Sequence, residues 1–339
     1  MNQNFFYISK EQSNMLKGIA ILFMVFLHLF NSLSFVRDYT PLLYVGNIPF
    51  VHWLCRAMNP VAFYLFISGY GLYYSYISGK LDLVFNTKRI FKLYLYWWVC
   101  LIIMIPIGLI MAPGRFSMSF DIILQNVSAI NTSWYPQAWF LFPYVLIVFS
   151  SKYVFKFLDR IGPCISFISS ALLYYGASFL ISRYHHCDNV FMQIFFPYFQ
   201  CLGVFCLGSI FCMLANDKNI IFPKYICNNT ILTLILIMLV LLTSWLNLPI
   251  FRIVYVILFV LTFIQMSLGK RVKAVLMYMG GVSTAIWLTH SYYCYYIFHD
   301  FVFGFKYPLI IFLVTVFCSM ITALVINYII NLLSKMLKI

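Results

Sequence analysis

Two histidines inside apolar segments are the residues of this chain best suited to chemistry. His28 lies in a segment at about residues 14–35, and His290 lies in another at about 275–299. An imidazole with an unperturbed pKa of about 6.5 suits a general base at neutral pH. Because a titratable group is costly to place inside a membrane, each histidine is predicted to be functional. A structural histidine bonded across helices is the alternative, and position alone leaves both open.

Basic residues near the same segments predict a site for a phosphate-bearing ligand at the inner face. Lys17 lies eleven residues before His28, which is about 16 Å along a helix, so it is too deep to be only a flanking residue. A basic loop before the third apolar segment carries Lys80, Lys88, Arg89 and Lys92. This loop equally fits a topology signal with attraction to anionic lipid.

A break of small residues, Ser68-Gly69-Tyr70-Gly71, interrupts the second apolar segment. Such a break predicts either close packing of helices or a narrow lining where the chain of a ligand passes against backbone. The residues alone do not decide between these two interpretations.

Paired histidines can also bind metal, but a zinc site requires three or four ligands. The eight acidic residues all lie outside the middle of the apolar segments. The sequence therefore predicts no metal site, and it disfavours an ion-coupled transporter, which usually places a carboxylate in the membrane.

Composition indicates a polytopic membrane protein. The chain has 339 residues, of which 64% are hydrophobic and 9% are charged, whereas a soluble protein carries about 25% charged residues. The net charge of +14 is explained by basic loops that set topology, so no nucleic-acid partner is predicted. The ten cysteines form no C-x-x-C pair, and His52, His185, His186 and His299 are expected in loops or at span ends.

We predict an all-α membrane helix bundle, a single domain over residues 1–339 with no appended soluble domain. Ten spans are expected, at about 14–35, 57–78, 93–112, 136–156, 163–183, 193–215, 228–247, 250–268, 275–299 and 307–332. With both termini inside, sixteen Lys and Arg residues fall in inner segments and six in outer segments. This asymmetry favours the N-in, C-in orientation. His28 and His290 then lie at matching depth, each about 21 Å or 22 Å into its span.

Five short motifs, in the right order along the chain, resemble the acyltransferase-3 family of integral membrane O-acyltransferases. They are Lys17 with His28 ten intervening residues later, Phe63 to Tyr70, Lys88 to Tyr94, Trp139-Phe140-Leu141, and Ser283 with Leu288 and His290. The chain departs from the family where Lys17 replaces the typical Arg and Trp287 replaces a common Tyr. Lysine keeps the charge but lacks the bidentate fork of arginine.

The resemblance implies acyl transfer, usually of acetyl from acetyl-CoA, to a sugar hydroxyl. The CoA phosphates are expected against Lys17, Lys88, Arg89 and Lys92, with Ser68 along the path of the pantetheine arm. His28 would deprotonate the hydroxyl or relay the acyl group, and His290 would orient His28 or polarise the thioester carbonyl. The acceptor, a glycan or lipid-linked saccharide, is expected from outside, near Trp139, Arg56 and Tyr70.

The expected setting is a multi-pass protein of a bacterial cytoplasmic membrane that contacts membrane lipids, with a homo-oligomer left open. The alternative function is a transporter or flippase of a polar or lipid-linked solute. That alternative predicts movement of the substrate without use of acyl-CoA.

Overall fold

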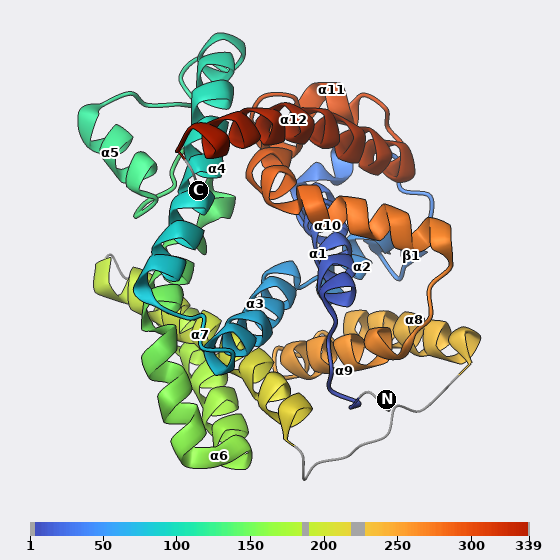
Figure 1. The fold of residues 1–339 in the computed structure, drawn as a ribbon. Coiled ribbons are helices and arrows are strands. Elements are labelled where there is room, and N and C mark those ends of the chain that lie inside the picture. The colour runs from blue at the N-terminus through green and yellow to red at the C-terminus, as the bar shows by residue number, and fades with distance from the viewer. Residues whose placement is uncertain (1–3, 185–189, 218–227, 338–339) are drawn as a thin grey trace.

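The computed structural model describes residues 4–184, 190–217 and 228–337, and these residues are almost entirely helical (Figure 1). His185 and His186, which were expected in loops or at span ends, lie outside the described residues. The long helices are α1 (Lys10–Phe30), α3 (Pro60–Ile77), α4 (Leu83–Met111), α6 (Leu141–Tyr184), α7 (Val190–Asn216), α8 (Asn229–Leu246), α9 (Phe251–Gln265), α10 (Lys270–Ser291) and α12 (Pro308–Leu337).

Short elements connect the long helices. They are η1 (Leu33–Arg37), the hairpin of β1 (Tyr44–Val45) and β2 (Ile48–Pro49), α2 (Phe50–Leu54), η2 (Cys55–Ala57), α5 (Phe120–Ser128), η3 (Pro136–Ala138), the π-helical turn η4 (Tyr292–Tyr296) and α11 (His299–Phe303). The predicted all-α membrane bundle is confirmed.

Eight helical segments among the described residues are long and apolar enough to cross a membrane. Each of the ten predicted spans overlaps a helix. Two predicted spans add to these eight. One is α9, which is apolar but has only 15 residues, and the other is the second half of α6, which is counted together with the first half. The third predicted span begins too late, because α4 starts at Leu83 and so carries Lys88, Arg89 and Lys92 within its first turns, while Lys80 lies before it.

A reversal of the chain at Gly162 divides α6. Gly162 has φ 77° and ψ 167°, a conformation that glycine adopts without the steric cost of a Cβ. The hydroxyl of Ser166 donates to the carbonyl of Leu158 at 3.2 Å. Eight residues of continuous helix would place these groups about 12 Å apart, so the two halves form a helical hairpin.

Helices α1 and α10 are in backbone contact and run parallel. A Cβ added at Gly18 would lie 2.2 Å from the carbonyl oxygen of Leu276, and one added at Gly280 would lie 2.0 Å from that of Asn14. Glycine is therefore required at both positions for this approach, as is common between membrane helices. Each glycine precedes a histidine by ten residues, about 15 Å of helix, so the contact aligns His28 with His290.

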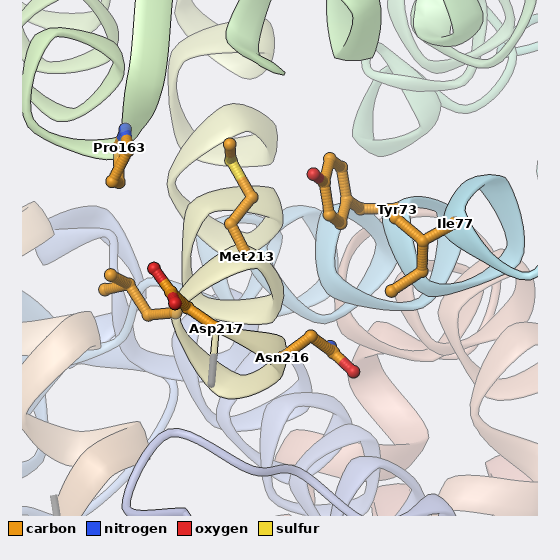
Figure 2. Close-up of a pocket in the computed structure, with 7 residues that line it drawn as sticks. Tyr73, Ile77, Pro163, Met213, Asn216 and Asp217 are labelled. Atoms are coloured by element: carbon orange, nitrogen blue, oxygen red, sulfur yellow. The ribbon is translucent and has the colours of Figure 1, made fainter. Parts of the chain in front are cut away.

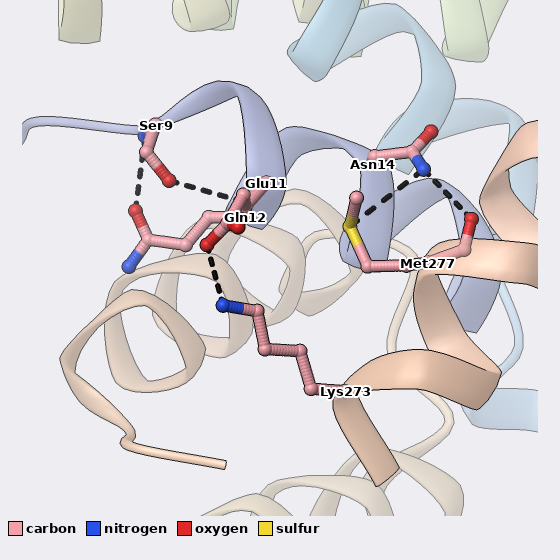
Figure 3. A network of polar contacts seen from close by, with 6 residues as sticks. All are labelled: Ser9, Glu11, Gln12, Asn14, Lys273 and Met277. Carbon is pink, nitrogen blue, oxygen red and sulfur yellow. Dashed lines mark hydrogen bonds and ion pairs between the residues drawn. The ribbon is translucent and has the colours of Figure 1, made fainter. Parts of the chain in front are cut away.

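Polar contacts hold the starting ends of the same two helices together (Figure 3). Ser9 and Gln12 form a capping box at the start of α1, which satisfies backbone groups that would otherwise lack partners. The amide of Asn14 donates to the carbonyl of Met277 at 2.7 Å, and Lys273 pairs with Glu11 at 2.6 Å. The register of α1 against α10 is thus set at their first turns, far from the histidines.

We expect Gly280→Ala to destabilise the protein because the new methyl group would overlap the Asn14 carbonyl. Overpacking of this kind costs about 1–3 kcal/mol, and the melting temperature in detergent should fall. Gly281→Ala is the matched control, since a Cβ there meets no heavy atom within 4 Å. Equal melting temperatures for the two variants would contradict the close contact of α1 with α10.

Candidate active site

The main cavity has a volume of about 520 Å³ and lies between α1, α3, α4, α6 and α10. It contains four of the five residues predicted to bind the donor. These are Lys17, Ser68, Arg89 and Lys92; the fifth, Lys88, is exposed and lies outside the lining. The lining residues include three cations and no carboxylate, so the cavity suits an anionic ligand.

Arg89 is held in place by two hydroxyl groups. Its Nε and Nη2 donate to the hydroxyl of Tyr144 at 2.9 and 2.7 Å, and Nη2 also donates to Ser68 Oγ at 3.1 Å. Tyr144 and Ser68 bond to each other at 2.8 Å. A guanidinium oriented in this way is prepared to bind a phosphate oxygen with its remaining N–H groups.

Lys17 enters the cavity from α1. The hydroxyl of Tyr64, from α3, donates to the backbone carbonyl of Lys17 at 3.2 Å and so joins the two helices at this depth. Lys17 and Arg89 line one cavity from different helices. An anion placed between two like charges relieves their repulsion, which strengthens the case for a phosphate here.

An aromatic stack lies at the far end of the cavity. Phe140, just before α6, and Trp287, on α10, both line the cavity and stack with ring centres 4.3 Å apart. The indole N–H of Trp287 donates to the carbonyl of Gln137 at 3.4 Å. The backbone carbonyl of Trp287 contacts His290, and neither His28 nor His290 is itself among the lining residues.

His28 and His290 meet directly, as their matching depths in the sequence indicated. His28 Nδ1 lies 2.6 Å from His290 Nε2, and the rings are stacked with centres 4.9 Å apart. His290 is fully buried and His28 is half-buried. His28 is therefore the more accessible of the two rings.

The partners of His290 assign the protons on both rings. His290 Nδ1 lies 3.1 Å and 2.9 Å from the carbonyl oxygens of Ile286 and Trp287, which only accept, so Nδ1 carries the proton. His290 Nε2 is then an acceptor, and His28 Nδ1–H donates to it. His28 Nε2 is left with its lone pair, which is the arrangement that a general base requires.

Tyr135, in the loop between α5 and η3, contacts the histidine pair. Its hydroxyl donates to the carbonyl of Trp287 at 2.6 Å, accepts from the backbone N–H of Ser291 at 3.2 Å, and lies 3.2 Å from His290 Nδ1. The π-helical turn η4 begins directly after Ser291, a distortion often found at functional sites. The sequence gives no local signal for Tyr135, because its loop reaches the histidines only through tertiary packing.

Polar and aromatic groups that do not line the cavity lie around the histidine pair. The ring of Tyr295 packs edge-on against His28 with centres 5.9 Å apart, and its hydroxyl donates to Asn31 at 3.1 Å. Arg115 lies over the ring of Tyr296 at 4.6 Å, and the Tyr296 hydroxyl donates to Gln137 at 2.6 Å. The tyrosine-rich run at residues 292–296, directly after His290, is the sequence feature that could have indicated Tyr295 and Tyr296.

The three residues predicted to bind the acceptor lie outside the lining of the main cavity. Trp139 is 44% exposed and contacts Phe140, but it lies outside the cavity lining. Arg56 lies in η2. Tyr70 is buried, and its hydroxyl accepts from the backbone N–H of Ile8 at 3.0 Å, so it binds the segment before α1. Their proposed roles stay predictions.

A second cavity of about 270 Å³ lies near the reversal of α6 and shares no lining residue with the main cavity. Figure 2 shows its lining, which includes Tyr73 and Ile77 of α3, Pro163 of α6 and Met213 of α7. It has no histidine in its lining. Within the described ranges, no group of three His, Cys, Asp or Glu side chains could hold a metal ion.

The fold and the main cavity define an integral, multi-pass membrane protein with a cationic cavity, one of whose lining residues, Trp287, contacts a histidine pair through its backbone carbonyl. Residues 11–332 match the family model described as an acyltransferase domain, and the chain belongs to this family, acyltransferase-3. The protein is thus a membrane acyltransferase. Comparisons with curated proteins and with solved structures gave no match.

We predict that both imidazoles carry their proton on Nδ1 at neutral pH. Solid-state ¹⁵N NMR of histidine-labelled protein should show a hydrogen bond from a protonated Nδ1 to an unprotonated Nε2. His28→Ala should remove this coupling and leave the Nδ1–H signal of His290, because the two carbonyl partners remain. A His290 protonated on Nε2 would contradict the assignment.

Proposed function

We propose that this protein is an O-acyltransferase that moves an acetyl group from cytoplasmic acetyl-CoA to a hydroxyl of a glycan or lipid-linked saccharide outside. The observation that carries the proposal is the main cavity, which has three cations and no carboxylate in its lining and ends at Trp287, the hydrogen-bond partner of His290. An anionic donor held at one end can thereby present its reactive group to the histidines at the other.

The donor is proposed to place its phosphates against Lys17, Arg89 and Lys92. The orientation inferred from Lys and Arg counts puts this end of the cavity at the inner face, where CoA is available. The pantetheine arm would run along Ser283 and Thr284 of α10 toward Trp287, all of which line the cavity. Lys88, which is exposed outside the lining, would contribute only long-range attraction.

The chemistry assigned to His28 is direct general-base catalysis. His28 Nε2 takes the hydroxyl proton as the hydroxyl oxygen attacks the thioester carbonyl carbon. The C–O bond forms, the C–S bond breaks, and the leaving thiolate recovers the proton from His28, giving an ester and free CoA. His290 accepts the Nδ1–H bond of His28 at 2.6 Å and so orients the ring and stabilises its protonated form.

The acceptor is proposed to approach over Tyr295 and Asn31, which do not line the cavity. Tyr295 packs against His28, and Asn31 accepts a hydrogen bond from Tyr295. Tyr296 and Arg115 extend the same surface. Tyrosine rings have an apolar face and a polar edge, which suits the mixed surface of a sugar. Trp139, exposed at the start of α6, remains a further predicted contact for the acceptor.

The test is acyl transfer by purified protein in lipid nanodiscs, with radiolabelled acetyl-CoA and cell-envelope glycans as acceptor. The wild type should release CoA and add one acetyl mass to a glycan. His28→Ala should lose transfer by about a thousandfold, since loss of a general base typically costs 10²–10⁴-fold, while it still binds CoA. Arg89→Ala should weaken CoA binding instead, and more so at low salt than at high salt.

Full transfer by His28→Ala would contradict the assignment of the base. Accumulation of unmodified saccharide inside vesicles, with no thioester consumed, would contradict the acyltransferase reaction and favour the transporter alternative. No contact in the described structure favours that alternative over transfer.

A further inference from the structure

The stacked rings of Phe140 and Trp287 have no role in the proposed acyl-transfer step. Both rings are buried, with 6% and 5% of their surface exposed, and both line the cavity. His290 follows Trp287 by three residues on the same helix, which is about 4.5 Å of axial rise. The two rings are therefore the part of the cavity lining from which an acyl group directed along α10 toward His290 would be contacted.

Contacts of both the side chain and the backbone hold Trp287 and Phe140 in place. Trp287 belongs to α10, its indole N–H donates to the Gln137 carbonyl at 3.4 Å, and its own carbonyl accepts from Tyr135 and from His290. Phe140 directly precedes α6 and packs on the indole plane at an angle of 26°. A displaced indole would lose both its bond to the Gln137 carbonyl and its stacking on Phe140, so these two contacts oppose its movement.

We infer that Phe140 and Trp287 determine which acyl groups the enzyme accepts, by restricting the space beside the histidines to a two-carbon group. The inference rests on the proposed function and names the specificity of that same site. An acetyl group adds only a methyl beyond the thioester carbonyl, whereas each further methylene must displace one of the two rings. Closely packed interiors resist such displacement, because extra methylenes force off-rotamer side chains.

Trp287 also accounts for one departure from the family pattern. The sequence resemblance places a tyrosine commonly at this position. The indole is larger than a tyrosine ring, and it occupies part of the cavity lining three residues before His290. The indole additionally spans to the Gln137 carbonyl and thereby joins α10 to η3. The specificity of this chain is accordingly assigned to the pair of rings and not to either ring alone.

The test compares acetyl-CoA with hexanoyl-CoA as donors in nanodiscs, with CoA release and glycan mass as readouts. The wild type should strongly prefer acetyl-CoA. Phe140→Ala should raise the ratio of hexanoyl to acetyl transfer by about tenfold or more, within the range that pocket size contributes to specificity. Phe140→Leu, which opens less space and conserves more packing, should give a smaller shift in the same direction.

Phe149→Ala is the matched control, because Phe149 lies on α6 with 39% of its surface exposed and outside the cavity lining. This variant should keep the wild-type donor ratio. Folded Phe140→Ala and Phe140→Leu proteins with an unchanged ratio would overturn the inference while leaving the proposed function intact, as would a wild type that uses both donors equally. A wild type that transfers no acyl group from either donor would overturn both.

Discussion

The backbone contact of α1 with α10 is the constraint on which the rest of the site depends. Two glycines, Gly18 and Gly280, allow the helices to approach until an added methyl group would collide with a carbonyl oxygen. Because the helices run parallel and each glycine precedes its histidine by ten residues, this one contact brings His28 to 2.6 Å from His290. Small residues at a helix interface thus set the geometry of polar residues three turns away.

The main cavity is organised by charge. Lys17, Arg89 and Lys92 come from two helices and share one cavity without a carboxylate among its lining residues. The hydroxyls of Ser68 and Tyr144 orient Arg89 but leave its charge uncompensated. Such an arrangement is unfavourable when empty and favourable around an anion. In the proposed function, the anionic part of the ligand therefore lies against these cations and its reactive part lies near Trp287.

Much of this arrangement could be predicted from the sequence. Helical rise and the loop charges place His28 and His290 at equal depth, and the basic loop predicts that Arg89 and Lys92 join Lys17. The break at residues 68–71 leaves open whether it serves packing or a ligand path, and the structure shows close packing there with a cavity beside it. Gly69 packs against the backbone of α7 near Phe205, and Ser68 lines the cavity.

The residues that the sequence could not identify depend on helix rotation and on long-range packing. Trp139 is predicted at the site, but its neighbour Phe140 lines the cavity, and both residues lie in the turn between η3 and α6, whose side-chain directions no periodic pattern predicts. Tyr64, Ser68 and Gly71 share the cavity face of α3, whereas Tyr70 points to Ile8. Tyr135 reaches His290 across 155 residues of chain, a contact that no local pattern encodes.

The central claim is that one ligand spans from the cations to the histidine pair, and a structure with a non-hydrolysable acetyl-CoA analogue tests it most directly. Electron cryomicroscopy of that complex in nanodiscs should place the diphosphate within hydrogen-bond distance of Lys17 and Arg89. It should also place the acyl carbonyl carbon about 3–4 Å from where a hydroxyl bonded to His28 Nε2 would lie. An analogue bound outside the main cavity, or with its acyl group directed away from His28, would contradict the account.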